Sequence, residues 1–367
     1  MMRRGSPGVQ RPFVVALAVG AIAFAAVPVA AQDGGLDPAA DLAQQTLTIS
    51  NWAGYMPEDL PARFEEEFGT KVTVANHATN EEIVAKLTAG GDSGVDIAFV
   101  SGQFAQALAA QGLLFPIDQA AVPNMANLYP EAMQLAYDPG NAYSIPYAWG
   151  TTGLCYRSDL VAEEPDSWLD LLQPAEDVTG KTTMLFTERW LMLPAQKALG
   201  FSVNTTDEAE MAQVKDLLAA AKPTLLAFDD TTFYSRLVSG EAVLVEAWDG
   251  WCNYGIAENP EIRFVVPSEG SDLWVDTMVV LNSSQNKEAA HAFIDYILRP
   301  DVHRWVAENI LYKVPNQAAM EMIDPSLAET FPNMAITPAE LLAQEELVDL
   351  GEAAPLYTEI ATEIAAQ

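Results

Sequence analysis

Strand and helix patterns alternate between residues 46 and 100 of this 367-residue chain. Within this stretch Leu60, Phe64 and Phe68 recur at helical spacing, and Gly69 ends the run. The expected elements are strands 46–49, 71–75 and 95–100 and helices 57–68 and 80–87, with Asn80 as the cap of the second helix. This alternating order predicts a mostly parallel sheet with helices on both faces.

A second α/β pattern follows an extended apolar segment. The segment covers residues 143–153, and the second pattern runs from 154 to 266. A strand over 273–281 and a helix over 287–298, ended by Pro300, come next. Because about 330 residues exceed one usual domain core, we expect two lobes. The predicted fold is an α/β two-lobed clamshell, in which each lobe is a mostly parallel sheet flanked by helices and a ligand cleft lies between the lobes.

The N-terminus has the parts of a secretory signal peptide. A start with three arginines precedes an apolar run over 13–27, and small residues follow up to a cleavage point near Ala31. Residues 1–31 are therefore expected to be removed on export, and residues 32–44 to form a flexible leader. The apolar run is short for a membrane span, so a retained anchor is the alternative interpretation.

The net charge limits which partners the protein can bind, and the cysteine content relates to the compartment in which it folds. The formal charge is −33 and becomes −36 once the leader, with three arginines and no acid, is removed. No basic stripe is present to neutralise phosphates, so nucleic acid is excluded as a partner. Cys155 and Cys252 are the only cysteines. In an oxidising compartment they can form one disulfide, and the alternative is two small residues packed apart.

Aromatic residues and one carboxylate stand where the chain is expected to leave strands. Trp274 and Asp276 lie at an expected crossing between the lobes, and Trp248 follows a strand of the second lobe. Aromatic faces with a carboxylate suit a buried organic cation. Loops after parallel strands converge at one edge of a sheet. A cleft between the lobes would collect Trp52, Tyr55, Ser101, Trp248, Trp274 and Asp276.

Short segments spread over residues 46–319 resemble the periplasmic spermidine/putrescine-binding proteins of bacterial polyamine importers. Besides the aromatic segments, the resemblance is carried by Tyr137-Asp138-Pro139-Gly140-Asn141, Ser144-Ile145-Pro146-Tyr147, Trp149-Gly150-Thr151-Thr152, Asn204-Thr205-Thr206-Asp207, Pro267-Ser268-Glu269-Gly270 and Pro315-Asn316. The resemblance implies a monomeric periplasmic receptor without a cofactor. It also implies delivery of a small-molecule amine to the permease subunits of an ABC transporter in the inner membrane.

The resemblance also implies lobe boundaries and residue roles. Residues 45–150 with 275–320 would form lobe 1, and residues 151–274 with 321–367 would form lobe 2. Ser101 would hydrogen-bond an ammonium group, and Asp276 would pair with it. The aromatic walls would be Trp52, Tyr55, Trp248, Trp274 and Tyr312.

The chain departs from the family pattern where relatives carry additional polar groups. Gly54 and Trp190 stand at positions of acids, Gln103 replaces a tyrosine, and Trp251 replaces an acid common in putrescine-binding relatives. The acid Glu188 is out of register with the family motif. Together with the residues named above, the expected ligand-binding residues include Gln103, Glu188, Trp190 and Trp251. Each buried ammonium needs a counter-charge. Two ligand classes therefore stay open: a polyamine, and a mono-cationic, quaternary or zwitterionic amine. A preference for diamines would require an acid such as Glu188, Glu345 or Glu346.

An enzymatic function is the remote alternative. His77, His291 and His303 are widely separated, and no pairing of histidines or cysteines suited to zinc occurs. Nucleophile-elbow and phosphate-loop motifs are absent from the sequence. Asp276 and Glu188 could form the acid pair of an extracytoplasmic hydrolase, but a carboxylate among tryptophans is equally expected beside a bound cation. We therefore expect neither catalysis nor a metal site.

Overall fold

The computed structural model describes residues 1–2, 35–90 and 92–366. Apart from its first two residues, the expected signal peptide lies outside the described residues, as does the beginning of the expected leader. The described residues between 36 and 366 form one compact unit. In that unit the leader is attached to the fold, because the backbone N–H of Asp37 donates to Glu288 at 3.1 Å. Within the described part of the chain, no helix is long and apolar enough to cross a membrane.

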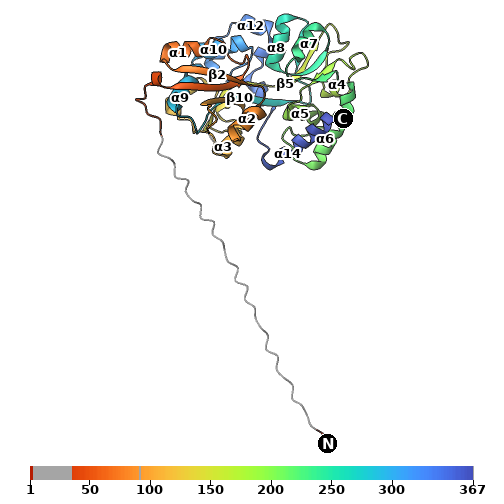
Figure 1. The fold of residues 1–367 in the computed structure, drawn as a ribbon. Coiled ribbons are helices and arrows are strands. Elements are labelled where there is room, and N and C mark those ends of the chain that lie inside the picture. The colour runs from red at the N-terminus through yellow and green to blue at the C-terminus, as the bar shows by residue number, and fades with distance from the viewer. Residues whose placement is uncertain (3–34, 91, 367) are drawn as a thin grey trace. The chain divides into compact units, whose positions relative to one another are not determined.

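The first sheet contains the predicted alternating unit. Its strand order is β11-β10-β3-β1-β2, and β4 also pairs with β10. Figure 1 labels two of these strands, β2 and β10. β1, β2 and β3 are parallel, as predicted, whereas β10 is antiparallel to β3 and β4. The strands are β1 (Thr46–Trp52), β2 (Lys71–His77), β3 (Ile97–Ser101), β4 (Ser144–Gly150), β10 (Asp272–Val280) and β11 (Glu345–Glu346).

Alternate residues of β3 pack against helices on opposite faces of this sheet. Phe99 belongs to the same core cluster as Phe64 of α1, and Val100 belongs to the cluster of Leu87 of α2 and Leu108 of α3. This alternation is the period of two expected for a strand buried on both faces. The helices associated with this sheet are α1 (Leu60–Phe68), α2 (Asn80–Thr88), α3 (Gly102–Ala110), α9 (Lys287–Ile297) and α10 (Pro300–Ile310).

The predicted cap of α2 is wrong by one residue. Thr79 is the N-cap, with an extended backbone and a side chain that accepts from the N–H of Glu82. Asn80 instead bonds to Ser101: its Oδ1 accepts from the Ser101 N–H at 2.9 Å, and its Nδ2 donates to the Ser101 hydroxyl at 3.0 Å. A tertiary contact therefore uses the side chain that the local pattern assigned to capping.

The second sheet has the order β7-β6-β8-β5-β9. β6 is parallel to β7 and β8, but β5 is antiparallel to β8 and β9, so the parallel part of this sheet is smaller than predicted. The strands are β5 (Thr152–Arg157), β6 (Thr182–Met184), β7 (Ala227–Phe228), β8 (Leu244–Trp248) and β9 (Ile262–Val265). The helices that follow these strands or lie between them are α4 (Trp168–Leu172), α5 (Glu188–Ala198), α6 (Glu208–Ala221), α7 (Phe233–Ser239) and α8 (Asp249–Glu258).

Two crossing segments join the sheets and are bonded to each other. β4 passes into β5 through Thr151, and β9 leads to β10. The Thr151 hydroxyl donates to the carbonyl of Asp272 at 2.7 Å, and the N–H of Thr152 donates to the Asp272 carboxylate at 2.9 Å. The Ser271 hydroxyl donates to the carbonyl of Thr152 at 2.6 Å. The lobe boundaries inferred from the sequence stay predictions, although β10 already begins at Asp272.

The C-terminal segment contacts both sheets. β11 pairs with β10 of the first sheet, and α14 packs on α5 and α6 beside the second. The helices of this segment are α11 (Gln317–Met320), α12 (Pro325–Thr330), α13 (Pro338–Leu342) and α14 (Ala354–Ala366). Short 3-10 turns lie at η1 (Leu42–Gln44), η2 (Gln119–Ala121), η3 (Pro123–Asn127), η4 (Pro130–Met133), η5 (Lys222–Thr224), η6 (Pro332–Ala335) and η7 (Gly351–Ala353).

A disulfide joins Cys155 of β5 to Cys252 of α8, with the Cα atoms 5.9 Å apart. The prediction of one bridge is confirmed, and the alternative of two cysteines packed apart is wrong. The bridge fixes the first turns of α8 against the second sheet. Trp248 ends the strand that leads directly into this helix. The disulfide therefore stabilises the backbone next to Trp248, which is one of the predicted aromatic walls.

Candidate ligand-binding site

Asp276 on β10 accepts hydrogen bonds from two neutral hydroxyl groups. The Ser101 hydroxyl donates to Oδ1 at 2.7 Å, and the Tyr55 hydroxyl donates to Oδ2 at 2.8 Å. Ser101 lies opposite Asp276 because β3 and β10 pair in antiparallel register. Burial raises the pKa of Asp276 to about 6, and the two hydrogen bonds oppose the rise. These contacts orient the carboxylate without supplying a cation to cancel its charge.

Four of the predicted aromatic residues form one contact group with this carboxylate. Tyr55 contacts Trp52 and Tyr312, with ring centroids 5.6 Å and 5.3 Å apart. Tyr312 contacts Trp274 at 5.5 Å. The contacts are edge-to-face, a favourable arrangement of ring quadrupoles. The hydroxyl of Tyr147, which sequence reasoning did not assign to the site, donates to the carbonyl of Tyr55 at 2.7 Å and fixes the turn after β1.

The start of α3 places Ser101 beside Asp276. Ser101 is the N-cap of α3, and its hydroxyl is bonded to Asp276. The carboxylate therefore lies at the positive end of the helix dipole, which offsets part of its desolvation. A Cβ at Gly102 would come within 2.6 Å of the Tyr137 ring, so only glycine fits there. Gln103 is buried, and its Nε2 has no hydrogen-bond partner among the described residues.

A second aromatic group surrounds Trp248 at the end of β8. Trp248 contacts Trp190 at 5.4 Å and Trp251 at 6.2 Å between ring centroids, and Trp251 contacts Phe233 at 5.2 Å. Trp248 and Trp251 are half-buried, whereas Trp190 is only 4% exposed. The Trp190 Nε1–H donates to the carboxylate of Asp272 at 2.9 Å. Trp190 thus supports Trp248 from the protein interior.

Tyr254 connects the two aromatic groups. Its ring lies 6.2 Å from that of Trp251 and 6.5 Å from that of Tyr312. Its hydroxyl donates to the carbonyl of Ile310 at 2.8 Å, which ties α8 to the end of α10. Sequence reasoning missed this residue. The signal available was its position three residues after Trp251, a spacing that places both side chains on one face of α8.

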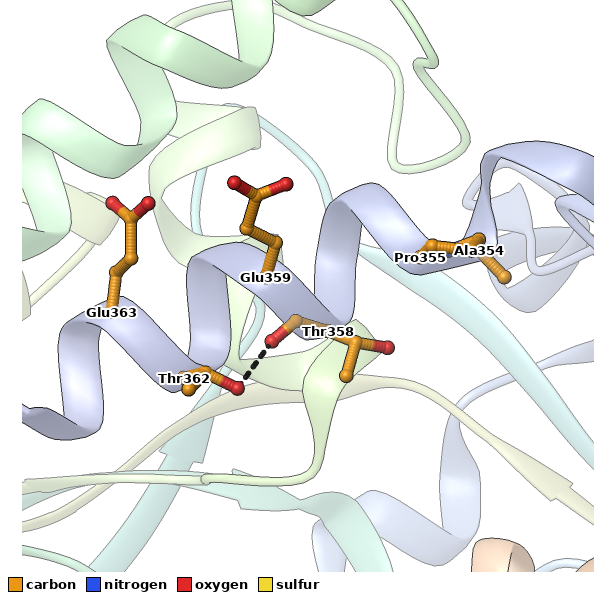
Figure 2. Close-up of a pocket in the computed structure, with 6 residues that line it drawn as sticks. All are labelled: Ala354, Pro355, Thr358, Glu359, Thr362 and Glu363. Atoms are coloured by element: carbon orange, nitrogen blue, oxygen red, sulfur yellow. Dashed lines mark hydrogen bonds between the residues drawn. The ribbon is translucent and has the colours of Figure 1, made fainter.

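Glu188, the first residue of α5, is bonded to the C-terminal helix α14. Its carboxylate accepts from the hydroxyl of Thr358 on α14 at 3.1 Å. Figure 2 shows the surface hollow along this helix, where the Thr362 hydroxyl donates to the carbonyl of Thr358 at 2.8 Å. The hollow is lined by Ala354, Pro355, Thr358, Glu359, Thr362 and Glu363, none of which is a predicted site residue. Burial raises the pKa of Glu188, and nearby Glu81 contributes to the rise.

The two tail acids also have protein partners. Glu345 accepts from Lys197 Nζ at 3.2 Å, and Glu346 accepts from the backbone N–H groups of Ala136 and Tyr137, each at 2.9 Å. Because adjacent residues of a strand point to opposite sides, β11 holds segments on both of its sides. None of these hydrogen bonds involves Asp276 or the two hydroxyl groups that donate to it.

The three histidines are packed into the fold. Nε2 of His291 accepts from the N–H of Asp118 at 3.1 Å, and Nε2 of His303 bonds with the carbonyl of Tyr147 at 2.9 Å. His77 contacts the Trp52 ring at 4.8 Å, so it supports a predicted wall. Within residues 35–90 and 92–366, no group of three metal-ligating side chains is found.

Two α/β sheets joined by crossing strands, with aromatic groups and an oriented carboxylate beside the crossings, define the class of two-lobed binding proteins. The chain belongs to the bacterial extracellular solute-binding proteins, which it matches over residues 59–325. It is a binding protein rather than an enzyme, and its location is periplasmic.

Named relatives and solved structures agree with this assignment. The spermidine/putrescine-binding periplasmic protein of Salmonella typhimurium is 32% identical over 319 residues, covering 86% of this chain and 90% of the relative. The putrescine/cadaverine-binding protein of Pseudomonas aeruginosa is 31% identical over 322 residues, covering 84% and 90%. A solved structure described as a putative spermidine/putrescine ABC transporter from Listeria monocytogenes has a TM-score of 0.81 at 30% identity, covering 88% of this chain and 99% of that chain.

Proposed function

We propose that this protein is the substrate receptor of an ABC importer for a polyamine or a related cationic amine. The observation that carries the proposal is the Asp276 carboxylate, which is oriented by the hydroxyls of Tyr55 and Ser101 within a group of aromatic rings. A bound ammonium would supply the missing counter-charge. Each ring contact would add roughly 0.5–2 kcal/mol of cation–π attraction. The names of the relatives in Salmonella and Pseudomonas support the same class of ligand.

A receptor for an amine with one cationic centre is the second candidate function. Asp249, the other carboxylate that approaches Trp274 and Tyr312, already has a counter-charge in its ion pair with Lys313. The second ammonium of a diamine would need a further counter-charge. Quaternary and zwitterionic amines belong to this candidate class because aromatic faces can hold a diffuse charge without hydrogen bonds.

Ligand binding would favour the closed arrangement of the lobes. Trp274 and Tyr312 lie near one end of the aromatic path, and Trp248 and Trp251 lie near the other. A ligand that touches both groups binds only when they approach each other, so its differential affinity shifts the population toward the closed form. The closed receptor would then deliver its ligand to the permease subunits of the importer.

A thermal-shift screen of the purified mature protein tests the proposed function. Diamines, polyamines, monoamines, quaternary amines and amino acids are added separately, and the melting temperature is recorded. At a ligand concentration of 100 Kd, binding stabilises the native state by about 2.7 kcal/mol. An amine that raises the melting temperature and is recovered unchanged supports a receptor. If no amine raises it, or if a product forms, the proposal is wrong.

A further inference from the structure

Two buried acids lie on either side of the ring pair Trp274–Tyr312. On one side is Asp276, two residues after Trp274 and on the same face of β10. Tyr55, which donates to Asp276, contacts the Tyr312 ring at 5.3 Å. On the other side is Asp249, the first residue of α8. The ring pair therefore has a carboxylate near each of its members.

Two glycines show how closely Asp249 approaches these rings. A Cβ at Gly150 would lie 2.3 Å from the Trp274 ring and 2.4 Å from Oδ1 of Asp249. A Cβ at Gly250, the residue after Asp249, would lie 2.3 Å from the Tyr312 ring. Both positions exclude any larger residue, so the rings and the carboxylate pack around the same two backbone points.

The two carboxylates differ in their partners. Asp276 is bonded to hydroxyl groups, as described above, whereas Asp249 forms an ion pair with Nζ of Lys313. The two side chains of this pair are 1% and 3% exposed. The Lys313 ammonium also donates to the carbonyl of Asn333 at 3.0 Å, and Nδ2 of Asn333 donates to the carbonyl of Asp249 at 2.8 Å. The protein thus supplies its own ammonium group at one end of the ring pair.

The backbone fixes Lys313 in this position. Lys313 directly follows Tyr312, and the preceding Leu311 adopts a left-handed conformation with φ of 53°. Nδ2 of Asn253 donates to the Leu311 carbonyl at 2.8 Å, and the N–H of Trp149 donates to the Lys313 carbonyl at 3.2 Å. A non-glycine residue with positive φ persists only where its surroundings hold it. The ammonium is therefore a built part of the site and not a mobile surface charge.

We propose that Lys313 determines ligand specificity by occupying the carboxylate of Asp249. The pair is neutral as a whole, so Asp249 cannot act as the counter-charge for a second ligand ammonium. Of the two acids on either side of Trp274 and Tyr312, Asp276 then remains the one whose charge a ligand can meet, and the receptor favours ligands with one cationic centre. The inference rests on the proposed function, because it concerns which amine the same site accepts.

Three probes with the same four-carbon chain test the inference: butylamine, putrescine and 4-aminobutyrate. Their affinities are measured by titration calorimetry for the unmodified protein, for Lys313→Met and for the matched double variant Asp249→Asn/Lys313→Met. Lys313→Met frees a carboxylate, so the ratio of putrescine to butylamine affinity should rise at least tenfold. The double variant has no free carboxylate, so this ratio should return to that of the unmodified protein.

The single variant Asp249→Asn gives the opposite test and does not depend on the folding of Lys313→Met. It leaves the Lys313 ammonium without its partner, so 4-aminobutyrate should gain at least tenfold over butylamine. Equal ratios in all variants would overturn the inference while the proposed function stands. A tenfold preference of the unmodified protein for putrescine over butylamine would do the same. If no probe binds any of the proteins while another amine raises the melting temperature, the inference fails and the proposed function stands.

Discussion

The Asp276 carboxylate and its two hydrogen-bond donors come from three separate parts of the chain. β10 supplies the carboxylate, β3 supplies the Ser101 hydroxyl, and the turn after β1 supplies the Tyr55 hydroxyl. Burial raises the pKa of the carboxyl group to about 6 because water is replaced by rings, and the two hydrogen bonds limit the rise. A cation that binds here would stabilise the charged form and lower this pKa again.

The raised pKa predicts a pH dependence of amine binding. A cationic ligand binds the ionised carboxylate, and the carboxylate of the ligand-free protein becomes protonated as the pH falls through about 6. Affinity should therefore be constant above pH 7 and fall by up to about tenfold per pH unit below pH 6. Titration calorimetry between pH 5 and 8 measures this. Asp276→Asn is the control and should show weak, pH-independent binding; a flat profile in the unmodified protein would contradict the assigned pKa.

Trp190 is predicted to stabilise the fold through its hydrogen bond to Asp272. An acid at this position would place a second carboxylate beside a buried one and remove a packed ring, so Trp190→Glu should cost about 3–5 kcal/mol of unfolding free energy. Chemical denaturation measures the cost. Trp190→Phe, which keeps a ring but loses the donor, should cost less. Full stability of Trp190→Glu together with a new preference for diamines would show that residue 190 instead faces the ligand.

At the scale of elements, the local patterns predicted the alternating unit of β1, α1, β2, α2 and β3 because periodicity and end signals lie within each element. The antiparallel setting of β5 and β10 could not be read in the same way. Each of these strands is the first one after the chain crosses from the other sheet. Its direction therefore depends on where the crossing occurs. Strand pairing over long sequence separations is a tertiary property.

Sequence reasoning could name candidate site residues by their chemical type, such as an aromatic ring or a carboxylate. It could not name their hydrogen-bond or ion-pair partners. The role of Trp190 at the ligand stays a prediction, and the partner of its N–H, Asp272, is 82 residues away in the sequence. The ion pair of Asp249 and Lys313 joins residues 64 apart. No local pattern reveals such partners, because a buried polar group finds its partner through the fold.

The disulfide is the element-scale feature with a direct effect on stability. It closes a loop with a sequence separation of 97 residues, which in the chain-entropy account corresponds to about 4–5 kcal/mol. Replacement of both Cys155 and Cys252 by serine should lower the unfolding free energy by an amount of this order, measured by denaturant unfolding. Thiol labelling of the denatured, non-reduced protein is the control. Two labelled thiols per chain would show that the bridge is absent.

At the scale of the whole molecule, the crossing segments and the C-terminal segment connect the two sheets. The crossings bond to each other at Thr151, Thr152 and Asp272, and β11 pairs with β10 before α14 packs beside the second sheet. Tyr254 and Tyr312 lie where these connections bring the two aromatic groups into contact. The proposed ligand site therefore lies where the two sheets are joined.

Calorimetric titration of the unmodified protein and of Asp276→Asn, with the amine selected by the thermal-shift screen, tests the central claim most directly. The account predicts one ligand per chain and a loss of about 3–5 kcal/mol in Asp276→Asn, because a buried cation loses its counter-charge. Trp274→Ala serves as the comparison and should lose only about 1–3 kcal/mol, since it removes a ring and leaves the charge. Unchanged affinity in a folded Asp276→Asn variant would contradict the account.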